Sequence, residues 1–319
     1  MELIAPLLYF LGLVGCIALG AGGVSIGQGY AGGFATTALA RQYAAHGPVR
    51  RALIVGLAFL ESGCVFSLVI TLVFLFNPGV PLASWGAMVL GAAALSMGIV
   101  ACVVGAASGA IVAETMGALA RQPFEGASVV TFMMIAQILL EAPTIFMFII
   151  AFLVKSWVVP ALGSMQALAY MGGCLVFAVG CIGPAIGQAH FCSNIAKAMG
   201  INFDLYPKLF SFSFIVQAMI ETPIVFALLV SLMLLFSGPG IAATPVEMAA
   251  LCGGVMAAIG FGSAGAAIGS GRIASRAALC MAAQPEHATT LARLAIFCQA
   301  IIDTAVIYSL IISVLLIKR

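Results

Sequence analysis

The chain repeats one pattern four times along its 319 residues: a single carboxylic acid lies inside a long run of apolar residues. The acids are Glu61, Glu141, Glu221 and Asp303, and the spacing between successive acids is 80, 80 and 82 residues. A regular period over the whole chain indicates one structural unit written four times. A charged side chain near the centre of a bilayer costs about 2.5 to 3.5 kcal/mol on insertion scales, so an acid kept in every repeat predicts a functional site.

Composition places the chain in a membrane. Hydrophobic residues make up 64% of the sequence and charged residues only 7%, and the mean hydropathy is +1.23. Too few polar side chains exist to cover a globular surface in water, so we predict an integral membrane protein and expect no nucleic-acid partner. Eight apolar segments reach or exceed the about 20 residues that cross a hydrocarbon core. They cover residues 7–38, 53–76, 85–119, 129–154, 168–198, 209–236, 248–278 and 291–317.

The apolar segments predict helices, because barrel strands would alternate polar and apolar residues over about ten positions. The predicted fold class is therefore all-α, with eight transmembrane helices arranged as four tandem helical hairpins. Proline and glycine mark the linkers between hairpins at residues 77–81, 159–160 and 237–240. The predicted units are residues 1–79, 80–160, 161–241 and 242–319.

Positive charge is concentrated on one side of the predicted hairpins. Seven basic residues lie between the two helices of a hairpin: Arg41, Arg50, Arg51, Arg121, Lys197, Lys208 and Arg293. The opposite side carries Lys155, Lys318 and Arg319. The positive-inside rule therefore puts the hairpin loops in the cytoplasm and both termini on the opposite side. The N-terminal segment lacks the basic region of a signal peptide, so we expect it to be retained.

The first helix of every hairpin contains two glycines four residues apart. The pairs are Gly23 and Gly27, Gly105 and Gly109, Gly183 and Gly187, and Gly265 and Gly269. Glycines at this spacing share one helical face and let neighbouring backbones approach closely. The second helices carry Phe, Leu and Ile instead, so the pattern predicts an inner layer of thin helices and an outer layer of bulky ones. Two helices return the chain to its starting side, which makes the hairpins parallel repeats.

The second helices hold the acids together with polar neighbours. Gln137, Gln217 and Gln299 lie four residues before their acids, one helical turn away, where an amide can hydrogen-bond a carboxyl group. Hairpin 1 has Leu57 at that position. The nine cysteines lie singly in apolar segments without metal-type or redox-type pairing, so we interpret them as packing residues and expect no resident metal and no catalytic residue.

These motifs resemble the proteolipid c subunit of rotary ATP synthases, and the resemblance covers nearly the whole chain. Hairpin 1 shows the family pattern at residues 27–30 (Gly-Gln-Gly-Tyr), 40–42 (Ala-Arg-Gln) and 57–61 (Leu-Ala-Phe-Leu-Glu). Hairpin 2 has the complete loop motif Ala-Arg-Gln-Pro at residues 120–123. The resemblance implies an arc of a two-layer rotor ring in which each hairpin carries one ion on its acid.

The loop motif weakens in the second half of the chain. Hairpin 3 has Lys197 and Asn202 in its place, and hairpin 4 keeps Gln284 and Pro285 without the arginine. F-type c subunits usually have one hairpin and V-type ones commonly two, so four hairpins are atypical of both, while the loop motifs are closer to the F-type. The resemblance assigns the following residues to contact with the central stalk: Arg41, Gln42, Arg121, Gln122, Pro123, Gln284 and Pro285.

The resemblance implies a non-catalytic membrane component of an ATP synthase or ATPase complex. Its partners would be copies of itself in a ring, a stator a-type subunit with an essential arginine, central-stalk subunits at the loops, and bilayer lipid. A neutral acid can face lipid and a charged one cannot, so ion loading and release at the stator would drive rotation. Each charge moved across the membrane is worth about 2.3 kcal/mol per 100 mV. Because all four acids are present, the chain suits ATP synthesis.

The coupling ion depends on the groups beside each acid. Sodium-type members of the family add a helix-1 Gln, a Ser or Thr after the acid, and a nearby Tyr. The candidate supporting residues here are Gln28, Ser62, Gln137, Gln188, Gln217, Thr222, Gln299, Thr304 and Tyr308. Hairpin 2 has the poorest set, with Ser108, Ala142 and Phe146. A metal cation needs several oxygens at every station whereas a proton needs only the carboxyl and one partner, so we favour H+ over Na+ and expect no cofactor.

Other interpretations stay open at this point. One is a Na+-coupled or V/A-type pump rotor, and another is a structural proteolipid without ion turnover. A third is a self-contained secondary transporter or channel, in which the acids would form one relay beside a central cavity. Glu114 and Arg272 lie on first helices, and we expect Arg272 to extend towards the cytoplasmic end. The rotor interpretation fails if the four acids share one interior or lie at unrelated depths.

Overall fold

The computed structural model describes residues 3–237 and 242–318, and this part of the chain is helical. The long helices are α1 (Ile4–Arg41), α2 (His46–Phe76), α3 (Trp85–Arg121), α4 (Gly126–Trp157), α5 (Ser164–Ile201), α6 (Tyr206–Phe236), α7 (Pro245–Ala283) and α8 (Ala288–Lys318). Each predicted span lies within one of these helices, which confirms the all-α fold class with eight membrane-spanning helices. The linker positions 238–240, the boundary residue 241, the N-terminal residues 1–2 and Arg319 lie outside the described residues.

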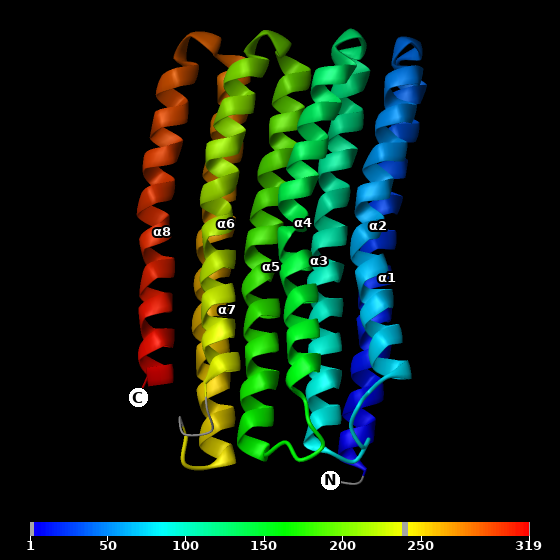
Figure 1. Ribbon diagram of the computed structural model, residues 1–319. Coiled ribbons are helices and arrows are strands. Elements are labelled where there is room, and N and C mark those ends of the chain that lie inside the picture. The colour runs from blue at the N-terminus through cyan, green and yellow to red at the C-terminus, as the bar shows by residue number, and fades with distance from the viewer. Residues whose placement is uncertain (1–2, 238–241, 319) are drawn as a thin grey trace.

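Each hairpin turns in the same way. The inner helix ends at an amide residue that leaves helical geometry while its N–H still bonds the carbonyl four residues earlier. These residues are Gln42, Gln122, Asn202 and Gln284. A single 3-10 turn follows: η1 (Tyr43–Ala45), η2 (Pro123–Glu125), η3 (Phe203–Leu205) or η5 (Pro285–His287). The four loops therefore lie at one end of the molecule, and the chain's two ends lie at the other (Figure 1).

Side-chain caps help to start the inner helices after their linkers. Ser84 Oγ accepts a hydrogen bond from the Ala87 N–H at 3.3 Å at the start of α3. At the start of α7, Thr244 Oγ1 accepts from the Glu247 N–H at 3.2 Å, and Glu247 Oε2 accepts from the Ala243 N–H at 2.9 Å. Such caps pair backbone donors that a helix start leaves free, so they fix where hairpins 2 and 4 begin, whereas α1 and α5 start without a side-chain cap.

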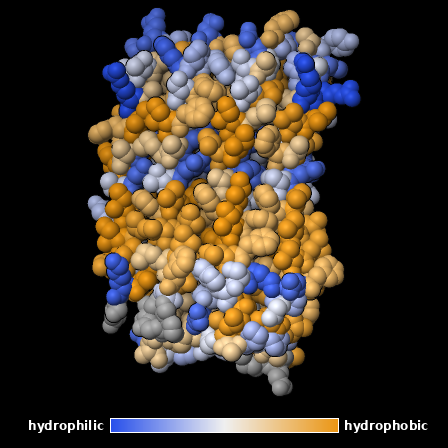
Figure 2. All heavy atoms as spheres, viewed as in Figure 1, coloured by the Kyte–Doolittle hydropathy of each residue, from blue (hydrophilic) through white to orange (hydrophobic). Residues whose placement is uncertain are grey.

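The helices form two layers. The inner helices α1, α3, α5 and α7 pack side by side in a row, and the outer helices α2, α4, α6 and α8 cover one face of that row. Each of the first three outer helices contacts its own inner helix and the next one along, which joins successive hairpins. Polar side chains gather at both ends of the molecule, and a narrower polar band interrupts the hydrophobic zone about halfway (Figure 2).

Glycine makes two of the three inner contacts unusually close. A Cβ atom added at Gly23 or Gly27 of α1 would overlap the backbone of Cys102 or Gly105 in α3. The same geometry recurs between α5 and α7, where a Cβ at Gly183 or Gly187 would overlap the backbone of residues 264 and 267. Only glycine permits helices to approach this closely, so the predicted inner layer of thin helices is present.

The middle contact, between α3 and α5, lacks these glycines. Val103 and Ala107 occupy the positions that correspond to Gly23 and Gly27. A cavity of about 690 Å³ lies beside this contact, lined by residues of α1, α3 and α5. The glycines of α3 serve a different contact from the one their spacing suggests, because Gly105 and Gly109 face back towards α1. The four glycine pairs are therefore not equivalent.

Candidate ion-binding sites

The four acids occupy the same position on four different outer helices. Each lies fifteen residues after the first residue of its helix, which are His46 in α2, Gly126 in α4, Tyr206 in α6 and Ala288 in α8. At 1.5 Å per residue this distance is about 22 Å, so each acid sits near the middle of its helix. The acids are distributed one per hairpin along the outer layer.

Sites 1 and 3 share one arrangement, in which an inner-helix glutamine bonds the acid. Gln28 Nε2 of α1 donates to Glu61 Oε1 at 3.2 Å. Gln188 Nε2 of α5 donates to Glu221 Oε1 at 2.9 Å and also to Gln217 Oε1 at 3.3 Å. Gln188 is fully buried, and it ties the two helices of hairpin 3 together at the level of the acid. The two inner-helix glutamines that the sequence singled out are thus brought to their acids.

Site 2 is the most enclosed of the four. The Glu141 side chain is only 6% exposed. Two hydroxyl groups lie beside its carboxyl group, that of Thr144 on the same helix and that of Ser62 on α2 of the preceding hairpin. Neither hydroxyl nor either carboxyl oxygen of Glu141 completes a hydrogen bond among the described residues. Four polar atoms at the junction of two hairpins are therefore left without a hydrogen-bond partner in the described structure.

Site 4 has the fewest protein partners. Asp303 is half-buried, and no hydrogen bond to its carboxyl group is found among the described residues. Gln299 and Ser270 are fully buried, yet no polar side-chain atom of either has a hydrogen-bond partner in the described structure. Thr304 Oγ1 donates to the Ile301 carbonyl at 2.7 Å, and the Tyr308 side chain is 65% exposed.

The outer-helix glutamines do not bond their own acids, contrary to the expectation from their spacing. Gln137 Nε2 turns inward and donates to Ser108 Oγ at 3.0 Å and to the Gly56 carbonyl of the preceding hairpin at 3.1 Å. Gln217 accepts from Gln188 of the inner helix. The buried side of the outer helix offers partners in two neighbouring helices, and these compete with the carboxyl group one turn away.

Two further supporting residues behave differently from expectation. Ser62 lies beside Glu141 of the next hairpin rather than completing the site of Glu61. Thr222 Oγ1 donates to the Ala218 carbonyl of its own helix at 3.2 Å, as threonine often does inside helices. Thr144 is a site residue that was not anticipated from the sequence. Its position three residues after Glu141 puts both side chains on one face of α4, and that spacing could have indicated it.

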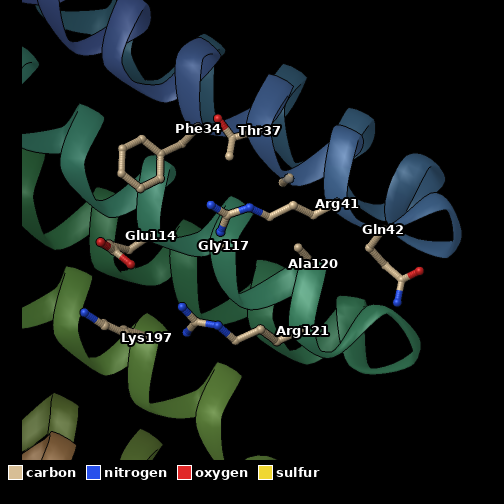
Figure 3. Close-up of a pocket in the computed structure, with 10 residues that line it drawn as sticks. Phe34, Thr37, Arg41, Gln42, Glu114, Gly117, Ala120, Arg121 and Lys197 are labelled. Carbon is tan, nitrogen blue, oxygen red and sulfur yellow. The ribbon is translucent and has the colours of Figure 1, made fainter.

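The loop residues gather at the opposite end from the linkers. Gln42, Gln122 and Gln284 end their inner helices, and the prolines at 123 and 285 begin 3-10 turns. Arg41 and Arg121 line a cavity of about 410 Å³ together with Lys197 and Glu114. Figure 3 shows the three cationic groups and the Glu114 carboxylate directed into this cavity. Glu114 thus lies among positive charges near the loop end of the inner layer.

Each site presents a single carboxyl group and is not built as a metal cluster. Among the described residues, no group of three or more His, Cys, Asp or Glu side chains is close enough to hold a metal ion. Each site instead offers one carboxyl group, and its neutral partners differ between sites 1 and 3 on one hand and sites 2 and 4 on the other. A proton needs only the carboxyl group, and an alkali cation would draw on the hydroxyl and amide oxygens nearby.

The fold and the sites together define a multi-pass integral membrane protein made of tandem helical hairpins, each with one carboxyl group at mid-helix. The family model for the C subunit of ATP synthase matches residues 91–154, 171–234 and 253–316, which are most of hairpins 2, 3 and 4. These segments cover more than half of the chain, so the protein belongs to the c-subunit family of ATP synthases. The family resemblance found in the sequence is thereby confirmed.

Individual c subunits match one hairpin's length of the chain. The ATP synthase c subunit of Microcystis aeruginosa is 48% identical over 66 residues, which are 20% of this chain and 78% of that protein. The ATP synthase c subunit of a Cyanothece strain is 51% identical over 63 residues, or 19% of this chain and 77% of that protein. The chloroplastic c subunit of Ostreococcus tauri is 43% identical over 77 residues, or 23% of this chain and 94% of that protein.

Proposed function

We propose that this chain is a rotor-ring component that carries one H+ on each of four mid-membrane carboxyl groups and couples ion flow to ring rotation. The observation that supports this most directly is the equivalent position of Glu61, Glu141, Glu221 and Asp303 on four separate outer helices. Stations that repeat along a row suit a rotor, because each can pass the stator in turn. A proton relay within one transporter would need the acids close together.

The differences between the four sites favour H+ over Na+. Only hairpins 1 and 3 bring an inner-helix glutamine to the acid, through Gln28 and Gln188. The acids of hairpins 2 and 4 have no hydrogen bond from an inner-helix glutamine, and Ser108 and Ser270 stand at the corresponding positions. A ring that used Na+ would need a sufficient oxygen set at every station. A carboxyl group that binds H+ needs no common set, so it tolerates this variation.

The proposed cycle follows from the energetics of charge in a bilayer. A carboxylate at mid-membrane costs about 2.5 to 3.5 kcal/mol on insertion scales, so a station that faces lipid travels in its neutral, protonated form. At a stator a-type subunit with a fixed arginine, the acid would release its proton to one side and reload from the other. Each transfer across the membrane gains about 2.3 kcal/mol per 100 mV. The retention of all four acids supports operation as a synthase.

The loop end supports the proposed contact with a central stalk in the cytoplasm. Gln42, Gln122 and Gln284 lie at the tips of three hairpins, and Arg41 and Arg121 lie just inside them. Hairpin 3 presents Asn202 instead. The helix ends beside the loops carry seven basic residues, against three acidic residues in the turns themselves (Glu125, Asp204 and Glu286), and this excess agrees with a cytoplasmic position by the positive-inside rule. In this orientation both chain ends lie on the opposite side of the membrane.

Carbodiimide labelling combined with single acid-to-amide variants tests the proposal. In the assembled complex, the reagent should modify the four acids, and each variant should lose its own label and reduce ATP-driven proton pumping. Glu247→Gln is the matched control, because that acid is exposed at the start of α7, at the opposite end from the hairpin loops, and a glutamine can still cap the helix. Sodium should not protect the four acids. Protection by sodium would assign Na+ instead, and normal pumping by all four variants would refute the proposal.

A further inference from the structure

A charged cavity lies near the loop end of the inner layer, and the proposed function gives no role to two of the residues that line it, Glu114 and Lys197. Arg41 of α1, Arg121 of α3 and Lys197 of α5 line this cavity of about 410 Å³ together with Glu114 of α3. Figure 3 shows the four charged groups directed towards the same space. Three cationic groups against one carboxylate leave a formal charge of +2, so the cavity attracts an anion.

Small residues leave room for a ligand between the charged groups. An added Cβ at Gly117 of α3 would meet only the carboxylate of Glu114, whose Oε2 lies 3.9 Å away. On α5, a Cβ at Gly200 would come within 3.5 Å of Nη1 of Arg121. The charged side chains therefore lie over glycines of two neighbouring inner helices, and the space between these side chains stays open.

The cavity lies at the depth of lipid headgroups. Arg41 and Arg121 are the last residues of their helices, and Lys197 lies one turn before the end of α5. The hairpin loops are about 22 Å from the level of the four acids, which the proposed function puts at the bilayer centre. A hydrocarbon core is about 30 Å thick, and the headgroup regions extend the bilayer to about 40 to 45 Å. The three cations therefore reach the level of lipid phosphate groups.

A second cavity continues from the first towards the bilayer centre. Glu114 lines both of them. The second cavity has a volume of about 690 Å³, and its lining includes the apolar residues Val103, Ala107 and Ile186 of α3 and α5. It is the space beside the contact that lacks the glycine pair. A cationic cavity that adjoins apolar space suits a molecule with a phosphate group and a hydrocarbon chain.

We propose that the charged cavity binds a phosphate monoester dianion, held by Arg41, Arg121 and Lys197. Guanidinium groups form paired hydrogen bonds with phosphate oxygens, and the lysine adds a point charge. A phosphate monoester carries a charge of about −1.5 to −2 at pH 7, which matches the charge of the cavity better than a diester does. Such a group occurs in phosphatidic acid and in free inorganic phosphate, and the adjoining apolar cavity favours the lipid.

The proposed site occurs once in the chain, unlike the ion sites and the loop motif. One repeat further along, Ile201 stands in place of Arg121 and Leu279 in place of Lys197. Basic residues in a last helical turn also interact favourably with the helix dipole, but Lys197 lies one turn earlier. The dipole therefore does not explain the whole cluster, and we expect one bound phosphate group per chain.

Native mass spectrometry of the purified full chain, titrated with dioleoyl phosphatidic acid, tests the site. One molecule should bind per chain, in preference to dioleoyl phosphatidylglycerol, which is a diester, and to dioleoyl phosphatidylcholine. Equilibrium dialysis with radioactive inorganic phosphate tests the soluble source. Binding of phosphatidic acid alone identifies a lipid headgroup as the ligand, and binding of inorganic phosphate identifies a site for the free anion. Binding of neither probe, or equal binding of the three lipids, would overturn the proposal.

Single variants make the test specific to the cavity. Arg121→Gln and Lys197→Gln should each weaken binding about 10-fold or more, because each removes a charged hydrogen-bond donor. The matched control is Lys208→Gln, at an exposed position of α6 outside the cavity, and it should bind like the unaltered chain. Glu114→Gln removes the anionic group and should strengthen binding several-fold.

Equal losses in the Lys197 and Lys208 variants would contradict the site, and so would weaker binding by Glu114→Gln. Carbodiimide labelling of the four acids in the same preparations reports separately on the proposed function. Normal labelling without phosphate binding would therefore refute the phosphate site alone, and phosphate binding without labelling would refute the rotor function alone.

Discussion

The close contact between α5 and α7 depends on glycine, so we predict that adding a single methyl group there destabilises the chain. A Cβ at Gly183 would overlap the Cα of Ala264, which is backbone and cannot move aside without the helix. Gly183→Ala should therefore push the two inner helices apart. The matched variant is Gly265→Ala, at the corresponding position of hairpin 4, where the added methyl group meets no atom within 4 Å.

The expected magnitude follows from the cost of overpacking. Forcing an extra methyl group into a close-packed contact typically costs about 1 to 3 kcal/mol. At about 1.4 kcal/mol per factor of ten, the ratio of folded to unfolded chain should fall about 5-fold to about 140-fold for Gly183→Ala. Gly265→Ala should not lower the free energy of unfolding of the isolated chain, because the site is open, and the higher helix propensity of alanine should raise it by about 0.5 to 1 kcal/mol.

Unfolding by SDS in mixed micelles, followed by tryptophan fluorescence, measures this difference. Trp157 is a suitable reporter, because its ring lies 4.9 Å from Phe236 and 6.0 Å from Tyr170 between centroids. The chain must be monomeric in the measurement, since Gly265 is expected to be covered in a ring. Equal destabilisation by the two variants, or none by Gly183→Ala, would refute the reasoning that glycine sets this contact.

Three further predictions concern the ion sites. Gln188→Leu removes a hydrogen-bond donor from Glu221 and should lower the free energy of unfolding by about 1 to 3 kcal/mol in the same SDS titration; an unchanged midpoint would contradict this. Tyr308→Phe should leave ATP synthesis unchanged, because the side chain is 65% exposed, and a loss would give its hydroxyl a role in ion binding. In the isolated chain, carbodiimide should label exposed Glu61 faster than 6% exposed Glu141, measured by peptide mass spectrometry, and equal rates would argue against the burial difference.

The helices and their pairing could be predicted from the sequence, because their signals are local. Apolar runs of sufficient length between prolines and glycines fix where a span begins and ends, and the regular position of the acids fixes the hairpin repeat. The two-layer arrangement followed from a difference in side-chain size between first and second helices. Each of these inferences needs only the residues of one helix or one hairpin.

The partners of individual polar groups could not be predicted, because they depend on neighbouring helices. The spacing of Gln137 and Glu141 allows a bond within one helix, but Ser108 and the Gly56 carbonyl lie within reach of the amide and take it. In the same way, the Gly105 and Gly109 pair has the right spacing but faces α1. Helical periodicity shows on which face of its own helix a residue lies. Which neighbouring helix packs against that face depends on how the whole row assembles.

The contact between α3 and α5 has Val103 and Ala107 in place of the glycine pair, and this difference divides the chain into two similar halves of two hairpins each. The two halves also share their site chemistry, since Gln28 and Gln188 bond the acids of the odd hairpins while Ser108 and Ser270 stand in the even ones. In a rotor assembled from such chains, successive stations would present different side chains beside the acid to the stator. Its torque profile would alternate between two kinds of step, and single-molecule rotation traces would show dwell times with a two-step rhythm.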